Sequence, residues 1–207
     1  MSSRIDEIVS AITRLERELE QEMHGPREQW RYRVDAGRVR FQAGVREAHR
    51  RLKKSIPRFL RDSNPLHILI APILYSLIIP IVILDLWTSV YQWVCFPVFR
   101  VSLVRRSSYV VIDRHHLSYL NPIEKMNCLY CSYANGVFAY VREIAGRTEQ
   151  YWCPIKHATR VRGAHGHYHA FVDFGDADGY RRRLPLLRAE LQGEGPAKTD
   201  DQGGTAR

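Results

Sequence analysis

Residues 66–99 read LHILIAPILYSLIIPIVILDLWTSVYQWVCFPVF, and this run decides the fold of the 207-residue chain. Its 34 residues contain one formally charged side chain, Asp85. A run of this length and apolarity predicts insertion into a membrane. One helical span needs about 20 apolar residues, and two spans need about 40 residues and a turn. The run fits neither number, so its sequence allows more than one arrangement in the membrane.

Basic side chains flank the run on both sides and favour a re-entrant helical hairpin over a single span. Positive flanks prefer the cytoplasmic side, and a hairpin that bends between Pro80 and Asp85 keeps both flanks there. The alternatives are a single span over 66–84 and a run that is only interfacial or buried. The candidate lipid-binding residues are the basic residues nearest the run: Arg50, Arg51, Lys53, Lys54, Arg58, Arg61, Arg105 and Arg106.

The charge of the whole chain also points to an anionic partner. There are 31 Lys and Arg residues against 22 Asp and Glu, which gives a formal net charge of +9. Such a balance suits anionic membrane lipid or nucleic acid, and the apolar run makes lipid the expected partner. The content of 45% hydrophobic and 26% charged residues argues against wholesale disorder and against a polytopic membrane protein.

Two helices of different character are expected before the apolar run. Residues 1–24 contain an acidic, coiled-coil-like helix over 4–23, whose seam of Ile5, Ile8, Ile12, Leu15 and Leu19 is spaced 3, 4, 3 and 4. This seam predicts a homo-oligomer or a protein partner. Residues 27–63 are expected to form a basic amphipathic helix, with twelve Lys or Arg against four Asp or Glu over 27–62. A helix of that charge suits an anionic lipid surface.

A soluble Cys/His module is expected over 100–191, followed by a disordered tail over 192–207. Its most specific feature is Cys128-x2-Cys131 followed by Cys153-x3-His157, which is the ligand spacing of a Cys3His metal site. Four protein ligands leave no open coordination position, so they predict structural Zn²⁺, with iron as the alternative. Helices over 122–133 and 137–151, separated by a break at Asn135-Gly136, would bring the two pairs together.

Other motifs complete the expected module. Asn121, Pro122 and Glu124 have the spacing of a helix start with a capping box. Short strands are expected over 108–114 and 168–174, and a last helix over 178–191. His165, His167 and His169 alternate, so on a strand they would face the same side and form a possible second metal site.

The expected fold class is mainly α with a small β component, made of the two N-terminal helices, the membrane segment and a small metal-stabilised α+β module. No P-loop, nucleophile elbow or dinucleotide-binding motif is present in the sequence. The expected function is therefore a membrane-attached, zinc-stabilised adaptor or scaffold without catalytic activity, on the cytoplasmic face of a membrane. The alternatives are a membrane-associated oxidoreductase that uses the Cys cluster as a thiol pair or an iron centre, and a nucleic-acid-binding zinc module.

Overall fold

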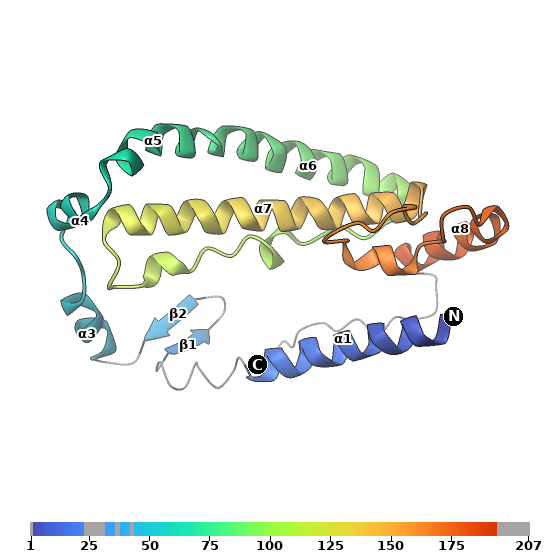
Figure 1. Cartoon of the computed structure of the whole chain (residues 1–207), viewed down its shortest axis with the longest axis horizontal. Coiled ribbons are helices and arrows are strands. Elements are labelled where there is room, and N and C mark those ends of the chain that lie inside the picture. The colour runs from blue at the N-terminus through green and yellow to red at the C-terminus, as the bar shows by residue number, and fades with distance from the viewer. Residues whose placement is uncertain (1, 23–31, 36–37, 42–43, 194–207) are drawn as a thin grey trace. The chain divides into compact units, whose positions relative to one another are not determined.

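The computed structural model describes residues 2–22, 32–35, 38–41 and 44–193, and most of them are helical (Figure 1). The elements in chain order are α1 (Ser2–Glu22), β1 (Tyr32–Asp35), β2 (Arg38–Phe41), α3 (Val45–Arg51), α4 (Ile56–Asp62), α5 (Pro65–Ser76), α6 (Ile78–Phe99), α7 (Pro122–Trp152) and α8 (Ala177–Leu191), with short 3-10 turns η1 (Arg106–Ser108), η2 (Arg114–His116) and η3 (Gly166–Ala170). The mainly α fold class is confirmed. The chain divides into two compact units, Met1–Asn64 with Asp113–Cys128 and Pro65–Ile112 with Leu129–Arg207.

In the second unit, α5 and α6 follow one another end to end and lie beside α7 (Figure 1). The buried residues of α6 are Ile81, Asp85, Thr88, Gln92 and Phe96. Their spacing of three and four residues puts them on one helix face. The facing side of α7 buries Ala134, Val137, Tyr140 and Ile144. Apolar side chains from both helices therefore form the core, together with Val101 and Val104 from the segment after α6.

The expected re-entrant hairpin is wrong, because α6 continues unbroken from Ile78 through Pro80 and Asp85 to Phe99. The chain is interrupted only at Leu77, between α5 and α6. Pro80 lies in the first turn of α6, where a missing N–H leaves no hydrogen bond unmade within that helix. Because proline has no N–H, Pro80 cannot donate the helical hydrogen bond to the carbonyl of Ser76. This lost hydrogen bond explains why α5 ends there. Pro80 thus divides the helix without reversing the chain.

The expected break in α7 at Asn135-Gly136 is also wrong, since α7 is one helix of 31 residues. The capping box at its start is confirmed: the Asn121 N–H donates to Glu124 Oε2 at 2.8 Å, and the Glu124 N–H donates to Asn121 Oδ1 at 3.0 Å. Gly136 is buried, and a Cβ there would lie 2.8 Å from the carbonyl oxygen of Tyr109. Glycine costs about 1 kcal/mol of helix propensity, and at this position it lets another segment pass close to the helix.

The segment that passes over Gly136 is residues 100–112, which we call the strap. It leaves the end of α6 and contributes buried Val101 and Val104 to the core. The expected strand over 108–114 is wrong, because this stretch contains parts of η1 and η2. The strand expected over 168–174 is likewise replaced by η3 and an isolated bridge between Ile155 and Val172. The last helix is confirmed as α8.

The first unit differs most from the sequence expectation. The helix over 4–23 is confirmed as α1 up to its last described residue, Glu22. The basic helix over 27–63 is wrong, because β1 and β2 form an antiparallel hairpin and α3 and α4 follow it. The hairpin pairs Tyr32 with Phe41 and Val34 with Val39, all residues that favour strands. Pro57 lies at the start of α4 and separates it from α3. The tail beyond residue 193 lies outside the described residues.

We predict that Gly136→Ala lowers the free energy of unfolding by about 1–3 kcal/mol, the usual cost of overpacking. The added Cβ would meet the strap backbone at Tyr109 and Val110, both at 2.8 Å. The matched control is Asn135→Ala, an exposed neighbour on the same helix. Chemical denaturation in detergent micelles measures both variants. A Gly136→Ala variant as stable as the wild type would contradict the close passage of the strap.

Candidate membrane-facing surface and its polar seam

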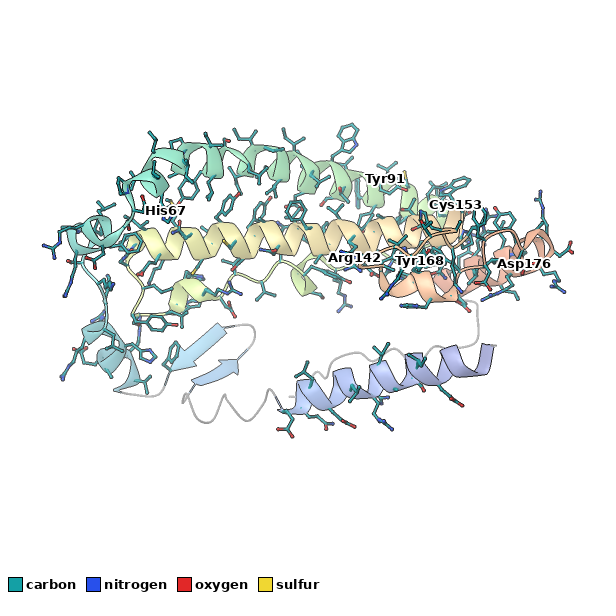
Figure 2. All side chains as sticks on the ribbon, viewed as in Figure 1. His67, Tyr91, Arg142, Cys153, Tyr168 and Asp176 are labelled. Carbon is teal, nitrogen blue, oxygen red and sulfur yellow. The ribbon has the colours of Figure 1, made fainter. Side chains whose placement is uncertain are left out.

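The side of α5 and α6 that faces away from α7 is covered by exposed apolar side chains (Figure 2). The stretch Pro65–Phe99 has a mean hydropathy of 2.5 in its most apolar 18-residue window, and 6% of that window is buried inside the protein. By length and composition it is long and apolar enough to cross a membrane. We call its exposed large apolar residues the outer face: Leu66, Ile68, Leu69, Ile70, Ile73, Leu74, Leu77, Ile79, Val82, Ile83, Leu86, Trp87, Val90, Trp93, Val94 and Val98.

The polar side chains in the middle of α6 lie on the opposite side, and we call them the polar seam. The seam consists of Asp85, Thr88, Ser89 and Gln92, of which all but Ser89 are buried. Partners for three of these four residues come from α7 and from the strap. Helix α6 is thus apolar outside and polar inside. The usual surface helix of a water-soluble protein has the reverse arrangement.

Asp85 forms the strongest contact of the seam. Its side chain is 10% exposed and accepts two hydrogen bonds from Arg106 of the strap, from Nε to Oδ1 at 3.0 Å and from Nη2 to Oδ2 at 2.7 Å. Tyr133 of α7 donates a third, from its hydroxyl to Oδ2 at 2.8 Å. This two-pronged geometry is the one that suits a guanidinium and a carboxylate. The single charge of the apolar run is therefore neutralised and fully hydrogen-bonded.

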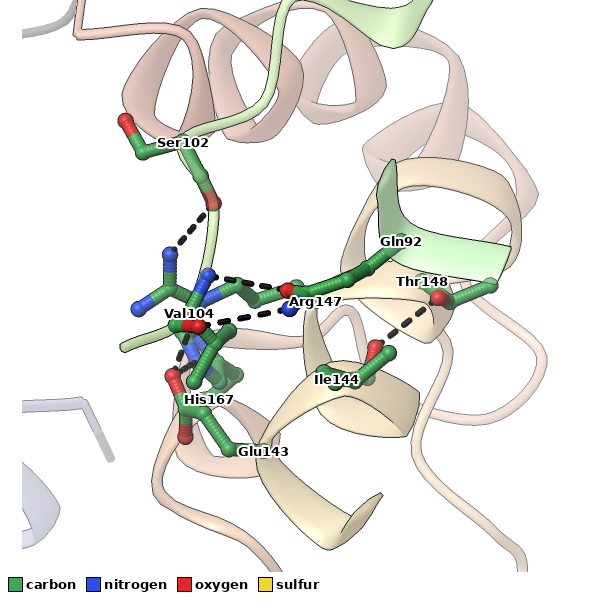
Figure 3. A network of polar contacts seen from close by, with 8 residues as sticks. All are labelled: Gln92, Ser102, Val104, Glu143, Ile144, Arg147, Thr148 and His167. Carbon is green, nitrogen blue, oxygen red and sulfur yellow. Dashed lines mark hydrogen bonds and ion pairs between the residues drawn. The ribbon is translucent and has the colours of Figure 1, made fainter. Parts of the chain in front are cut away.

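Two turns further along α6, Gln92 connects the same three segments, which are α6, the strap and α7 (Figure 3). Its Oε1 accepts from the Val104 N–H at 3.0 Å, and its Nε2 donates to the Val104 carbonyl at 3.3 Å and to the hydroxyl of Tyr140. The Tyr140 hydroxyl also lies 3.3 Å from Ser89 Oγ. Gln92 therefore pairs with the backbone of the strap as a neighbouring strand would. This arrangement fixes the position of the strap.

The expectations from the sequence included Asp85 but not the seam. The signal was present: Asp85, Thr88, Ser89 and Gln92 fall at i, i+3, i+4 and i+7, so they share one helix face. Four polar residues on one face of an otherwise apolar helix indicate a side that packs against protein. The partners Tyr133, Tyr140 and Arg106 could not be read from spacing, because they come from segments distant in the sequence.

The structure does not bring the four expected zinc ligands together. Cys131 and Cys153 lie at the two ends of a continuous helical stretch of 22 residues, which separates them by about 33 Å at 1.5 Å per residue. Cys153 stands at the end of α7 and is exposed (Figure 2). In the part of the chain that the structure describes, no group of three or more His, Cys, Asp or Glu residues could hold a metal ion.

One ion held by Cys128, Cys131, Cys153 and His157 would therefore require α7 to break between the two pairs. Cys128 and Cys131 are one turn apart on α7, so they remain a pair on one helix face. His157 instead contacts Tyr168, because its backbone N–H donates a hydrogen bond to the Tyr168 hydroxyl at 2.7 Å. Neither zinc nor iron enters the function proposed below.

The histidine cluster docks η3 and its N-cap residue His165 onto α7. His165 Nε2 lies 2.8 Å from Glu149 Oε2, and His167 Nε2 lies 3.2 Å from Glu143 Oε1, while His169 is exposed. The three residues lie in and beside a 3-10 turn, so the alternation expected on a strand does not align them. Two of the three are engaged by separate carboxylates and do not converge on one point.

Glu143 is the centre of a charged group on α7 (Figure 3). It accepts from His167 and, at 2.8 Å, from Arg147 Nε, while Arg147 Nη1 donates to the Ser102 carbonyl of the strap at 2.8 Å. The hydrogen bonds from His167 and from Arg147 lower the pKa of Glu143 to about 2. This group therefore ties η3, the strap and α7 together.

The expected lipid-binding residues divide into two kinds. Arg106 forms an ion pair with Asp85, and Lys54 forms one with Asp62 at 3.5 Å. The remaining members are exposed and form no ion pair among the described residues: Arg50, Arg51, Lys53, Arg58, Arg61 and Arg105.

No family model, curated protein or solved structure matches the chain.

We predict that Arg106→Gln lowers the free energy of unfolding by about 2–4 kcal/mol. It leaves the buried carboxylate of Asp85 without its counter-charge, and the cost stays below the maximum for a buried pair because Arg106 is 45% exposed. The matched control Arg105→Gln, next in the chain and exposed, should change stability by less than about 0.5 kcal/mol.

Adding Asp85→Asn to Arg106→Gln should recover at least half of the loss, because no buried charge then remains. Denaturant titration of the purified protein in micelles measures all three variants. Equal stability of Arg106→Gln and Arg105→Gln would show that the seam does not hold the strap.

Glu143 gives a pH dependence with a defined sign. Its pKa falls from an ordinary 4.5 to about 2 on folding, so the stability it contributes is present above pH 4.5 and is lost as the pH falls toward 2. Glu143→Gln should therefore cost about 1–3 kcal/mol at pH 6 and much less at pH 2.5. The control is Glu47→Gln, an exposed carboxylate. A difference between wild type and Glu143→Gln that is independent of pH would refute this account.

Proposed function

We propose that this chain is a membrane-attached adaptor without catalytic activity, and that α5 and α6 lie along the membrane surface instead of crossing it. The observation that carries the proposal is the inverted polarity of α6, with an apolar outer face and a polar seam against α7. Water would hydrate such a face at a large cost, since burying one Leu, Ile or Val is worth about 1.5–3 kcal/mol. The lipid boundary is the environment that removes this cost.

The strap argues against a spanning helix. A helix of 35 residues is about 52 Å long, whereas the hydrocarbon core is about 30 Å thick. The strap has an irregular backbone, and its exposed Arg105 lies next to Arg106, which binds Asp85 in the middle of α6. A spanning orientation would hold that backbone at the depth of the hydrocarbon, where lipid-exposed irregular segments do not occur.

An orientation along the surface satisfies both constraints. The outer face would enter the boundary between headgroups and acyl chains by about 5–10 Å, as amphipathic helices do. Helix α7 and the strap would lie on the aqueous side, together with the basic residues on both flanks. Each Lys or Arg near an anionic surface adds about 1 kcal/mol. Because positive flanks prefer the cytoplasm, we propose the cytoplasmic face.

The adaptor role rests on the surface of α1. Ile8, Ile12, Leu15 and Leu19, four of the five residues of the seam expected from the sequence, are exposed on this helix. A second copy of the chain or a partner helix would bury this seam. Membrane attachment through one part of the chain and partner binding through α1 together define an adaptor. The oxidoreductase alternative would need the Cys cluster as a thiol pair or an iron centre, and the nucleic-acid alternative would need the basic helix over 27–63 together with a zinc module.

We expect the double variant Ile83→Arg/Val90→Arg, on the outer face, to reduce binding to anionic lipid vesicles by at least about tenfold, because each charge would enter an apolar environment. The matched control is Leu186→Arg/Val161→Arg, at exposed apolar positions outside α5 and α6. Vesicle flotation measures both. Equal flotation of the two variants would contradict the proposal.

Topology is measured in the same vesicles. In a background with all four cysteines replaced by serine, Arg61→Cys and Ser107→Cys should be labelled by an impermeant maleimide from the same side. Labelling from opposite sides would mean that the segment crosses the membrane.

A further inference from the structure

We propose that the first unit contains a binding site for a phosphate-bearing ligand with two or more phosphate groups. The site is a hollow of about 770 Å³ lined by residues of α3, of η2 and of the first turns of α7. Six of its lining side chains are Arg46, Arg50, Lys53, His115, His116 and Lys125. Phe41 and Ser118 complete the lining, so among the described residues the hollow has no acidic wall.

The sequence explains why the cations face one space. Arg46 and Arg50 are one turn apart on α3 and therefore share a face. Lys53 follows the end of the helix, and its N–H donates to the Arg50 carbonyl at 3.2 Å, which keeps it on the same side. The basic stretch that the sequence analysis took for one long helix is thus folded so that three of its cations converge.

The opposite wall comes from a different part of the chain. His115 and His116 lie in η2 with their ring centroids 3.9 Å apart. Lys125 lies in the first turns of α7, just after the capping box in which Glu124 is occupied by the Asn121 N–H. The nearest carboxylate on that helix is thereby directed to the backbone and does not neutralise Lys125.

The four cations of the hollow differ from several other cations of the described chain, which are paired with carboxylates. Lys54, Arg106, Arg147 and Lys156 each form an ion pair with a carboxylate. Arg46, Arg50, Lys53 and Lys125 form none among the described residues. Four like charges around one hollow repel one another and lower stability unless an anion joins them.

The donors match phosphate chemistry. Guanidinium groups bind two phosphate oxygens at once, lysine ammonium groups act as point charges, and imidazole N–H and the Ser118 hydroxyl add hydrogen bonds. A single phosphate monoester carries at most two negative charges, so four cations fit a ligand with at least two phosphates. The volume lies within the range of small-molecule sites. Both a polyphosphorylated lipid headgroup and a free pyrophosphate or inositol phosphate have this chemistry.

The experiment uses the full-length chain in lipid nanodiscs. Inorganic pyrophosphate and inositol trisphosphate are titrated calorimetrically, and a phosphatidylinositol bisphosphate is tested by its incorporation into the nanodiscs. The pocket variant is Arg50→Gln/Lys125→Gln. The control is Arg51→Gln/Arg114→Gln, which removes the same net charge from neighbouring exposed positions outside the lining.

We expect saturable binding by the wild type and the control, and at least about a tenfold weaker affinity in the pocket variant, since that variant removes two of the four cations that would hold the phosphates. Binding of the soluble probes identifies a free phosphate ligand, and binding of the lipid alone identifies a headgroup. Equal loss in both double variants, or no saturable binding of any probe, would overturn the proposal. Flotation of the outer-face variant Ile83→Arg/Val90→Arg on anionic vesicles without polyphosphorylated lipid measures the proposed function separately, because neither substituted residue lines this hollow.

Discussion

The structure of the second unit depends on one constraint: a long apolar helix carries a carboxylate that must be neutralised on its inner side. Asp85 meets Arg106 and Tyr133 within 3.2 Å, and these partners come from the strap and from α7. An ion pair of a buried carboxylate adds little net stability over apolar packing but is costly to break, so it selects one arrangement. The pair determines which face of α6 turns inward and consequently which face is left exposed.

The remaining packing follows from that choice. The strap must pass close to α7 to deliver Arg106, and Gly136 provides the space for its backbone. Gln92 then pairs with Val104, and Arg147 holds the Ser102 carbonyl, so the strap is attached at three levels. Because α7 supplies partners along its whole second half, it remains one helix. This continuity is what keeps Cys131 far from Cys153.

The sequence predicted features that depend on local chemistry. The capping box of Asn121 and Glu124, the helix that became α1 and the last helix α8 are decided by neighbouring residues, and all three are confirmed.

Prediction from the sequence failed where distant contacts outweigh local preference. Asn135-Gly136 resembles a helix break, but packing against the strap outweighs its propensity. The high charge of the basic stretch after residue 27 predicted an amphipathic helix. Its first part instead forms β1 and β2, in which the strand-forming residues Tyr32 and Val34 pair with Phe41 and Val39. Ligand spacing predicted two pairs of metal-binding residues, but it could not show that α7 continues unbroken between Cys131 and Cys153.

The central claim is that the outer face of α5 and α6 lies parallel to the membrane surface, immersed in its boundary. Spin labels at Ile73, Ile83 and Val94, which are all exposed on that face, would report immersion depth from their relative accessibility to oxygen and to a water-soluble nickel chelate, in a background without the native cysteines. The account predicts the same depth for all three labels, near the level where headgroups meet acyl chains. A label at Ile83 that lies far deeper than those at Ile73 and Val94, or nickel access at all three equal to that of a water-exposed site, would contradict it.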